Sequence, residues 1–177
     1  MSLLKVSEIT DLTGAGSTYM PGHVVQVVQV VKTDQFVSTS TVYEDVTGIA
    51  ATITPKSSSS KILVIIQANV SSLANTLSDG AHFRISGGNS STYIGNAAGS
   101  REQSTYTFNQ LANGATLMIP MNITYLDSPS TASSVTYKLQ CRRASATNVV
   151  VNRTAADSDN ANFPRSPSSI TLMEIAQ

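Results

Sequence analysis

The chain has 177 residues, of which 41% are apolar, and its 11 basic and 11 acidic side chains give a formal net charge of zero. This length fits one domain with a short appendage, and the apolar content is sufficient for a buried core. Charged residues make up only 12%, about half of the usual share of roughly 25%. No stripe of Lys and Arg is present, which argues against a nucleic-acid partner, because phosphate binding needs concentrated positive charge.

Residues 1–22 form a separate N-terminal segment. Glycine-containing stretches at 13–17 and 21–22 break it from the rest of the chain. The segment is too short to fold alone, so its apolar residues must be buried by a partner or by the main domain. These anchor residues are Leu3, Leu4, Val6, Ile9 and Leu12. Neither a signal-peptide core nor a run of about 18 apolar residues is present, so we expect no membrane insertion.

The first predicted strand, at residues 23–31, is apolar on both faces. Val25, Val27 and Val31 alternate with Val24, Val28 and Val30. A strand of this kind is typical of the interior of a sandwich or of a contact with another subunit.

Later segments alternate between apolar and polar residues, as strands with one buried side do. The clearest lie at residues 61–70, 81–86, 116–127 and 133–143, and shorter candidates lie at 43–45, 50–55, 105–111, 148–153 and 169–175. In the third clear segment we expect an unbroken buried row, which consists of Leu117, Ile119, Met121, Ile123 and Tyr125. Pro120, on its polar side, marks an edge strand or a bulge, because proline cannot donate to the ladder.

Eight to ten antiparallel strands without a fixed repeat predict an all-β fold. The favoured architecture is an antiparallel β-sandwich with jelly-roll topology, which covers residues 23–177. The near-zero net charge and the two-sided apolar strand further favour a homo-oligomer over a monomer.

Few residues in the chain have the character of a catalytic group or a metal ligand. His23 and His82 have no metal-ligand spacing, and Cys141, the only cysteine, falls inside a strand as a buried thiol. Most of the acidic residues fall in turns or at strand rims. We therefore expect no catalytic residues, no metal and no cofactor. Asp157 and Asp159 resemble half of a calcium loop without its glycine and distal glutamate, and whether they bind a metal stays open.

The exposed aromatic residue best suited to binding is Tyr93, within the glycine-rich stretch 87–100. Its polar neighbours are Asn89, Asn96 and Arg101, so the four could contact a glycan or another feature of a host surface. The alternative is that Tyr93 simply packs its loop against the domain.

Several segments together resemble the β-rich appendage domains of tailed-phage virions, especially those of marine and cyanobacterial phages. The segments occur in order at residues 45–55, 59–64, 125–129, 136–140, 151–153 and 169–175, and residues 4–6 and 9–14 resemble the attachment leader of such proteins. The resemblance covers the chain from about residue 22 to its end. It implies a trimeric β-sandwich that is made in the host cytoplasm, displayed on the particle surface, and attached to other virion proteins through the leader.

The resemblance leaves alternatives open. The chain lacks a repetitive or coiled shaft, which favours a short fibre or knob of the tail or head over a long fibre. The first functional hypothesis is host-surface recognition, and the second is a capsid-decorating protein that stabilises the particle. A polysaccharide-degrading enzyme is a third, remote alternative.

Overall fold

The computed structural model describes residues 20–72, 80–109, 116–144 and 148–177. These residues form ten antiparallel strands and one short 3-10 turn, η1 (Ser90–Thr92). The strands are β1 (Val24–Lys32), β2 (Phe36–Ser38), β3 (Glu44–Ile53), β4 (Lys61–Ser71), β5 (Gly80–Ser86), β6 (Tyr106–Asn109), β7 (Ile119–Asp127), β8 (Val135–Arg143), β9 (Val149–Val151) and β10 (Ser168–Ile175). The expected all-β class and the expected number of strands are both confirmed.

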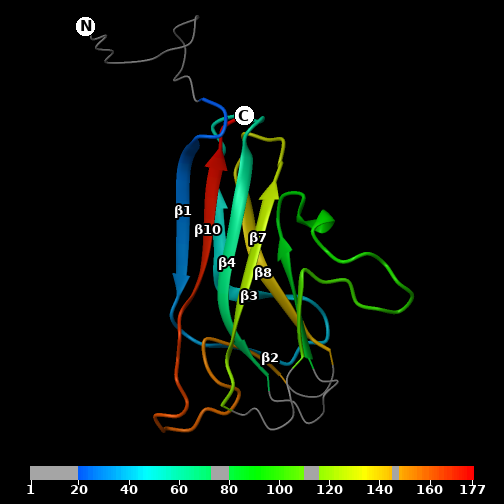
Figure 1. The fold of residues 1–177 in the computed structure, drawn as a ribbon, viewed down its shortest axis with the longest axis vertical. Helices are drawn as coiled ribbons and strands as arrows, with labels where there is room; N and C mark the ends of the chain where they lie inside the picture. The colour runs from blue at the N-terminus through cyan, green and yellow to red at the C-terminus, as the bar shows by residue number, and fades with distance from the viewer. Residues whose placement is uncertain (1–19, 73–79, 110–115, 145–147) are drawn as a thin grey trace, which may run out of the picture.

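The strands form two sheets, stacked as the layers of a sandwich (Figure 1). In the first sheet the strand order is β1-β10-β4-β7. The short strand β9 pairs with the end of β4 on the same edge as β10, and β2 pairs with β9. The second sheet has the order β3-β8-β5-β6. When the three-residue strands β2 and β9 are set aside, every strand except β5 is followed in the chain by a strand of the opposite sheet. These eight strands, arranged as β1-β10-β4-β7 and β3-β8-β5-β6, form the jelly roll that the sequence favoured.

The core lies between the two sheets and is built from alternate residues of each strand. Ile62, Val64 and Ile66 of β4 point inward, and Tyr137, Leu139 and Cys141 of β8 meet them from the second sheet; all six are fully buried. The alternation read from the sequence therefore assigns the correct inward face to both strands. Burial raises the pKa of the Cys141 thiol to about 12, which keeps this side chain protonated and unreactive.

The expected row in β7 is buried only in part. Met121 and Ile123 are buried, whereas Ile119 and Tyr125 are half-buried at the rim of the core. Leu117 precedes the strand and is 40% exposed, so the prediction that it is a core residue is wrong. The strand β7 begins at Ile119, so the alternating pattern starts before the strand does. Pro120 is exposed on β7, which pairs with β4 alone among the described residues, so the predicted edge strand is confirmed.

Bulges shape two strands that the sequence described less well. The register of β1 shifts between Val24 and Gln26, after which Val28 and Val30 face the core while Val27 and Val31 face outward, both more than half exposed. The sequence placed two separate strands at 43–45 and 50–55. The structure joins them as β3, whose register shifts between Asp45 and Ala50 around Gly48, a residue with a φ of 88°.

The two ends of the sandwich domain are held together. The Gly22 amide donates to the Ala176 carbonyl at 2.8 Å, and the Ala176 amide donates to the His23 carbonyl at 2.9 Å. Residues 20–22 therefore lie beside the C-terminus of the domain, at the top of Figure 1. The predicted anchors Leu3, Leu4, Val6, Ile9 and Leu12 of the N-terminal segment lie outside the described residues. No helix among the described residues is long and apolar enough to cross a membrane.

Candidate surface-recognition site

The loop between β5 and β6, residues 87–105, carries the four predicted contact residues. It leaves β5 through Gly87 and Gly88, which have φ angles of 113° and 52°. A Cβ atom on Gly87 would lie 2.1 Å from the Thr136 carbonyl oxygen, and one on Gly88 would lie 1.9 Å from a carboxylate oxygen of Asp127. Glycine is thus required at both positions, because the backbone of the loop passes directly over β7 and β8.

The base of this loop is fixed by the buried carboxylate of Asp127. Its Oδ2 accepts a hydrogen bond from the Tyr137 hydroxyl at 2.5 Å, and its Oδ1 accepts one from the Tyr125 hydroxyl at 3.1 Å. The backbone N–H of Asn89 donates to the same carboxylate at 3.1 Å. The pKa of Tyr137 is raised by burial and then by its hydrogen bond to Asp127, so its hydroxyl remains a donor. Asp127 was expected at the end of the 116–127 strand, and it anchors the loop from inside the domain.

Two tyrosines stack where the loop meets β7. The rings of Tyr93 and Tyr125 lie 4.7 Å apart with an interplanar angle of 16°. Tyr93 is 37% exposed, and Thr105 Oγ1 donates a hydrogen bond to the Tyr93 backbone carbonyl at 2.7 Å. One face of the Tyr93 ring is therefore covered by Tyr125, as the packing interpretation of Tyr93 required. The other parts of the ring border a shallow hollow of about 300 Å³ between Thr92 and Thr105.

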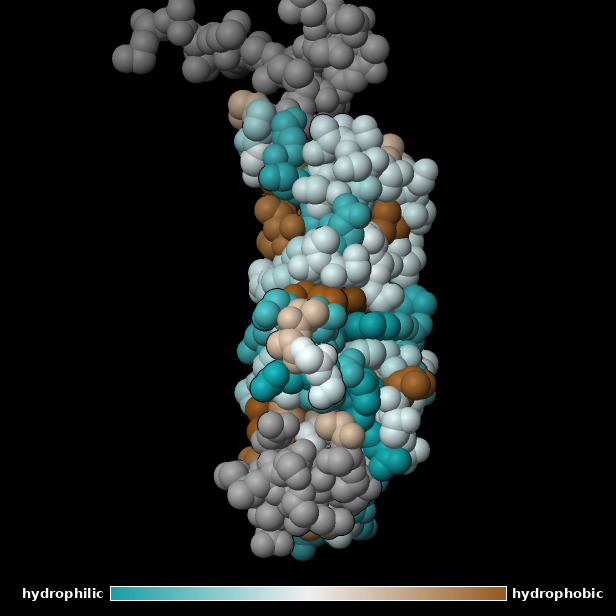
Figure 2. Space-filling view, turned by 90° about the vertical axis from the view of Figure 1, so that its right-hand side faces the viewer, coloured by the Kyte–Doolittle hydropathy of each residue, from teal (hydrophilic) through white to brown (hydrophobic). Residues whose placement is uncertain are grey.

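The four predicted contact residues do not form one cluster of side chains. Asn89 and Tyr93 come together around Tyr125, whose hydroxyl oxygen lies 3.1 Å from the Asn89 carbonyl oxygen and shares its one hydrogen between this oxygen and Asp127. The Asn96 amide and the Arg101 guanidinium instead donate to the carbonyls of Ala97 and Ala98 in the outer part of the loop. The side of the molecule from which this loop projects is mostly hydrophilic, with small separated apolar patches (Figure 2).

The outer face of the second sheet carries charged side chains, four of which form two ion pairs. Lys138 Nζ lies 2.7 Å from Asp45, and Arg142 forms an ion pair with Glu102. Arg84 stacks 4.0 Å above the centre of the Tyr43 ring. Burial, opposed in part by these arginines, raises the pKa of Tyr43 to about 12. This cluster was not predicted, because its members come from β3, β5, β8 and the 87–105 loop.

The outer face of the first sheet has the opposite character. One row crosses all four long strands in register: Val27 pairs with Met173, Met173 with Leu63, and Leu63 with Leu126. Val27 and Leu126 are 54% and 48% exposed. Val24 and Ile175 pair in the neighbouring row, beside the end of the sheet where the N-terminal segment enters. Lys61 is the one charged residue among the described residues that these strands direct outward.

The histidine His82 and the aspartate Asp157, both considered in the sequence analysis, have partners within the domain. His82 accepts or donates a hydrogen bond with Thr107 at 3.1 Å, and burial, followed by the nearby Arg142, lowers its pKa. Asp157 is bound by Arg165 at 2.7 Å and lies 3.7 Å from Arg153, so two guanidinium groups occupy its carboxylate. Across the described ranges, no three His, Cys, Asp or Glu side chains gather in a geometry that could hold a metal ion.

Comparisons with known proteins add no family assignment. No protein-family model matches the chain, and a search of curated proteins finds no significant match. The functional argument therefore depends on the fold, the surfaces and the sequence resemblance.

Proposed function

We propose that this chain is a structural protein of a tailed-phage particle, where it forms a homotrimeric knob or short fibre that contacts the host surface. The observation that carries the proposal is the contrast between the two outer faces of the jelly roll. One outer face carries ion pairs and a stacked arginine. The other, here called the neutral face, is partly apolar and mostly uncharged, with Lys61 as its one charged residue among those described, and it lies beside Gly22 and the start of β1.

The neutral face is the favoured contact between subunits. The centres of protein interfaces are depleted of charge, and large exposed apolar patches are uncommon on monomers. On this face Val24, Val27 and Leu126 are each about half exposed, and Met173 and Leu63 complete the row between them. Trimerisation through this half of the sheet would place three N-terminal segments together, which suits attachment of the knob to a single site on the particle.

The sequence resemblance supports the location of the protein on a virion. The segments that carry it map onto β3, β4, β7, β8, β9 and β10 and so cover both sheets. Residues 1–22 would bind the particle, and the end of the sandwich remote from Gly22 would face outward.

Two experiments test the proposal. Light scattering of the intact protein should give three times the 18.6 kDa of one chain, and Leu126→Asp should give a folded monomer. The matched control is Thr47→Asp on the second sheet, which should remain trimeric. In parallel, an antibody against the chain should label purified phage particles in electron micrographs. A monomeric wild-type protein or unlabelled particles would contradict the proposal. Particles that fall apart without the protein would favour the capsid-stabilising alternative.

A further inference from the structure

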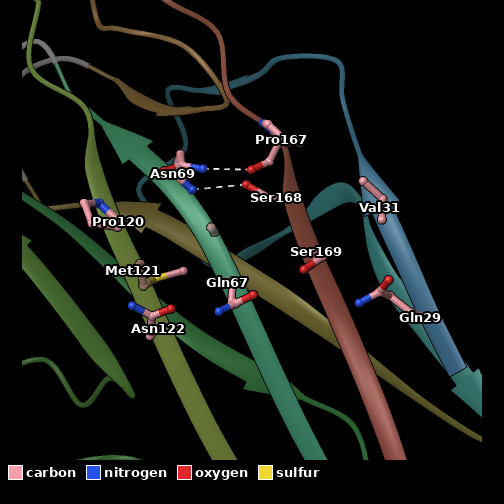
Figure 3. Close-up of a pocket in the computed structure, with 11 residues that line it drawn as sticks. Gln29, Val31, Gln67, Asn69, Pro120, Met121, Asn122, Pro167, Ser168 and Ser169 are labelled. Carbon is pink, nitrogen blue, oxygen red and sulfur yellow. Dashed lines mark hydrogen bonds between the residues drawn. The ribbon is translucent and has the colours of Figure 1, made fainter. Parts of the chain in front are cut away.

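The half of the neutral face remote from the N-terminal segment contains a groove. Its volume is about 410 Å³, which is within the usual range of small-ligand sites. Side chains from β1, β4, β7 and β10 line it, together with the residue that precedes β10 (Figure 3). β1 starts beside Ala176 and runs away from it, so Val31, which borders the groove, lies at the opposite end of the domain from Gly22.

Two amide side chains in the groove are free to bind a ligand. Gln67 of β4 and Asn122 of β7 are register partners, and both are exposed. Neither side chain has a hydrogen-bond partner among the described residues. An amide supplies two donor hydrogens and one acceptor oxygen, so this pair presents four donors and two acceptors to the groove.

Other polar groups along the groove are held in fixed positions. The Asn69 amide donates to the Pro167 carbonyl at 2.7 Å, as Figure 3 shows, and the Gln29 amide donates to Thr171 Oγ1 at 2.8 Å. The carbonyl oxygens of both side chains remain available as acceptors. Such preorganised groups lose little rotational freedom when a ligand binds.

The groove combines these polar groups with apolar walls, which Val31, Pro120 and Pro167 supply. Among the residues that the structure describes, no Lys, Arg, Asp, Glu or His lines it. A ligand that matches it has many uncharged hydroxyl groups and apolar C–H patches between them. Phosphate, sulfate and carboxylate ligands would lack a cation to pair with.

We propose that this groove binds a neutral glycan, with Gln67 and Asn122 donating to and accepting from sugar hydroxyls. The inference rests on the proposed role in host contact, and it moves the recognition site from the 87–105 loop to the outer sheet. The groove lies outside the apolar row assigned to subunit contact, so both surfaces can act in one trimer.

The test uses the full-length protein on a surface array that carries neutral glycans, sialylated and uronic-acid glycans, and peptides. We expect binding to one or more neutral glycans. The affinity should be unchanged between low and high salt, because no charge pair contributes to it. Removing both amides with Gln67→Ala and Asn122→Ala should weaken binding by about tenfold or more, the effect of losing one to two hydrogen bonds.

The matched control is Thr124→Ala, which removes an exposed outward side chain of β7 two residues beyond Asn122 and outside the groove. It should bind as the wild type does. Absence of binding to every neutral glycan, preference for acidic glycans or peptides, or equal binding by the double variant would overturn the proposal. A trimer that labels on particles but fails on the array would overturn this inference alone and leave the proposed function standing.

Discussion

The hydroxyl of Tyr137 donates to Oδ2 of Asp127 across 2.5 Å, inside the domain and beneath the 87–105 loop. Both residues are fully buried, so the carboxylate depends on protein donors in place of water. This contact joins β7 to β8 and holds the base of the loop that carries Tyr93.

Replacing Tyr137 with Phe removes one donor from the buried carboxylate. We expect Tyr137→Phe to lower the free energy of unfolding by about 1.5–3 kcal/mol, the contribution of one hydrogen bond to a charged group, because the Tyr125 hydroxyl and the Asn89 backbone amide still reach the carboxylate. Urea denaturation measures this change. The control is Tyr106→Phe, which removes a half-buried hydroxyl that has no hydrogen-bond partner among the described residues and should have a smaller effect. An unchanged midpoint for Tyr137→Phe would show that Asp127 does not need this donor.

Glu174 makes the stability of the domain sensitive to acid. Burial disfavours its charge, but hydrogen bonds from Gln26, Ser60 and the Lys56 amide outweigh burial and hold its pKa below the ordinary value of 4.5. Its contribution is therefore complete above pH 4.5 and is lost as the pH falls through the folded-state pKa, because the unfolded chain takes up the proton first.

We expect Glu174→Gln to melt at a lower temperature than the wild type at neutral pH. Between about pH 5 and pH 3 the difference should shrink, because only the wild type loses this carboxylate contribution. Thermal melts across this range by circular dichroism provide the measurement. Parallel curves for the two proteins would contradict the assignment.

Ile123 tests the inward face of β7. An aspartate at this buried position would leave a charge without a partner, and we expect Ile123→Asp to cost several kcal/mol, enough to prevent folding of a marginally stable domain. Ile119→Asp, at the half-buried start of the strand, should be milder. Soluble expression and near-ultraviolet circular dichroism distinguish folded from unfolded variants. If Ile123→Asp melts like the wild type, the register of β7 is wrong.

Removal of residues 1–20 tests the attachment role of the N-terminal segment. A chain that starts at Pro21 keeps the hydrogen bonds between Gly22, His23 and Ala176, so we expect it to fold and trimerise. It should fail to join particles when it is supplied to phage that lack the gene. Sedimentation of complemented particles, followed by immunoblotting, detects incorporation. Normal incorporation would show that attachment uses another surface, and an insoluble product would show that the segment packs on its own domain.

The sequence predicted those features of the fold that depend on the residue pattern within a single strand. Alternation alone identified the inward faces of β4 and β8, and Pro120 correctly marked an edge strand. It could not predict β2, which has only three residues, or the joining of 43–45 and 50–55 through the bulge at Gly48. Period-two patterns need more residues than β2 offers, and they assume a register that a bulge shifts.

Sites whose residues come together through the pairing of strands could not be predicted from the sequence. Gln67 and Asn122 are 55 positions apart and meet only because β4 and β7 pair in one register. The row from Val27 to Leu126 likewise needs three consecutive registers. The anchoring role of Asp127 was not predicted, because Tyr137 and the Asn89 backbone amide, which bind it from β8 and from the 87–105 loop, are distant in the sequence.

The bonds between Gly22, His23 and Ala176 also determine how the domain would carry mechanical load. In a knob anchored through residues 1–22, a pull from a moving host cell at the far end of the domain enters the sandwich at the start of β1. β1 and β10 form eight register pairs along the direction of that pull. Force along the strands loads this ladder in shear, so many hydrogen bonds must yield together, whereas force across the strands would open them one at a time. Because the chain enters the sandwich at the start of β1, the domain of such a knob would resist unfolding when it is pulled along its strands.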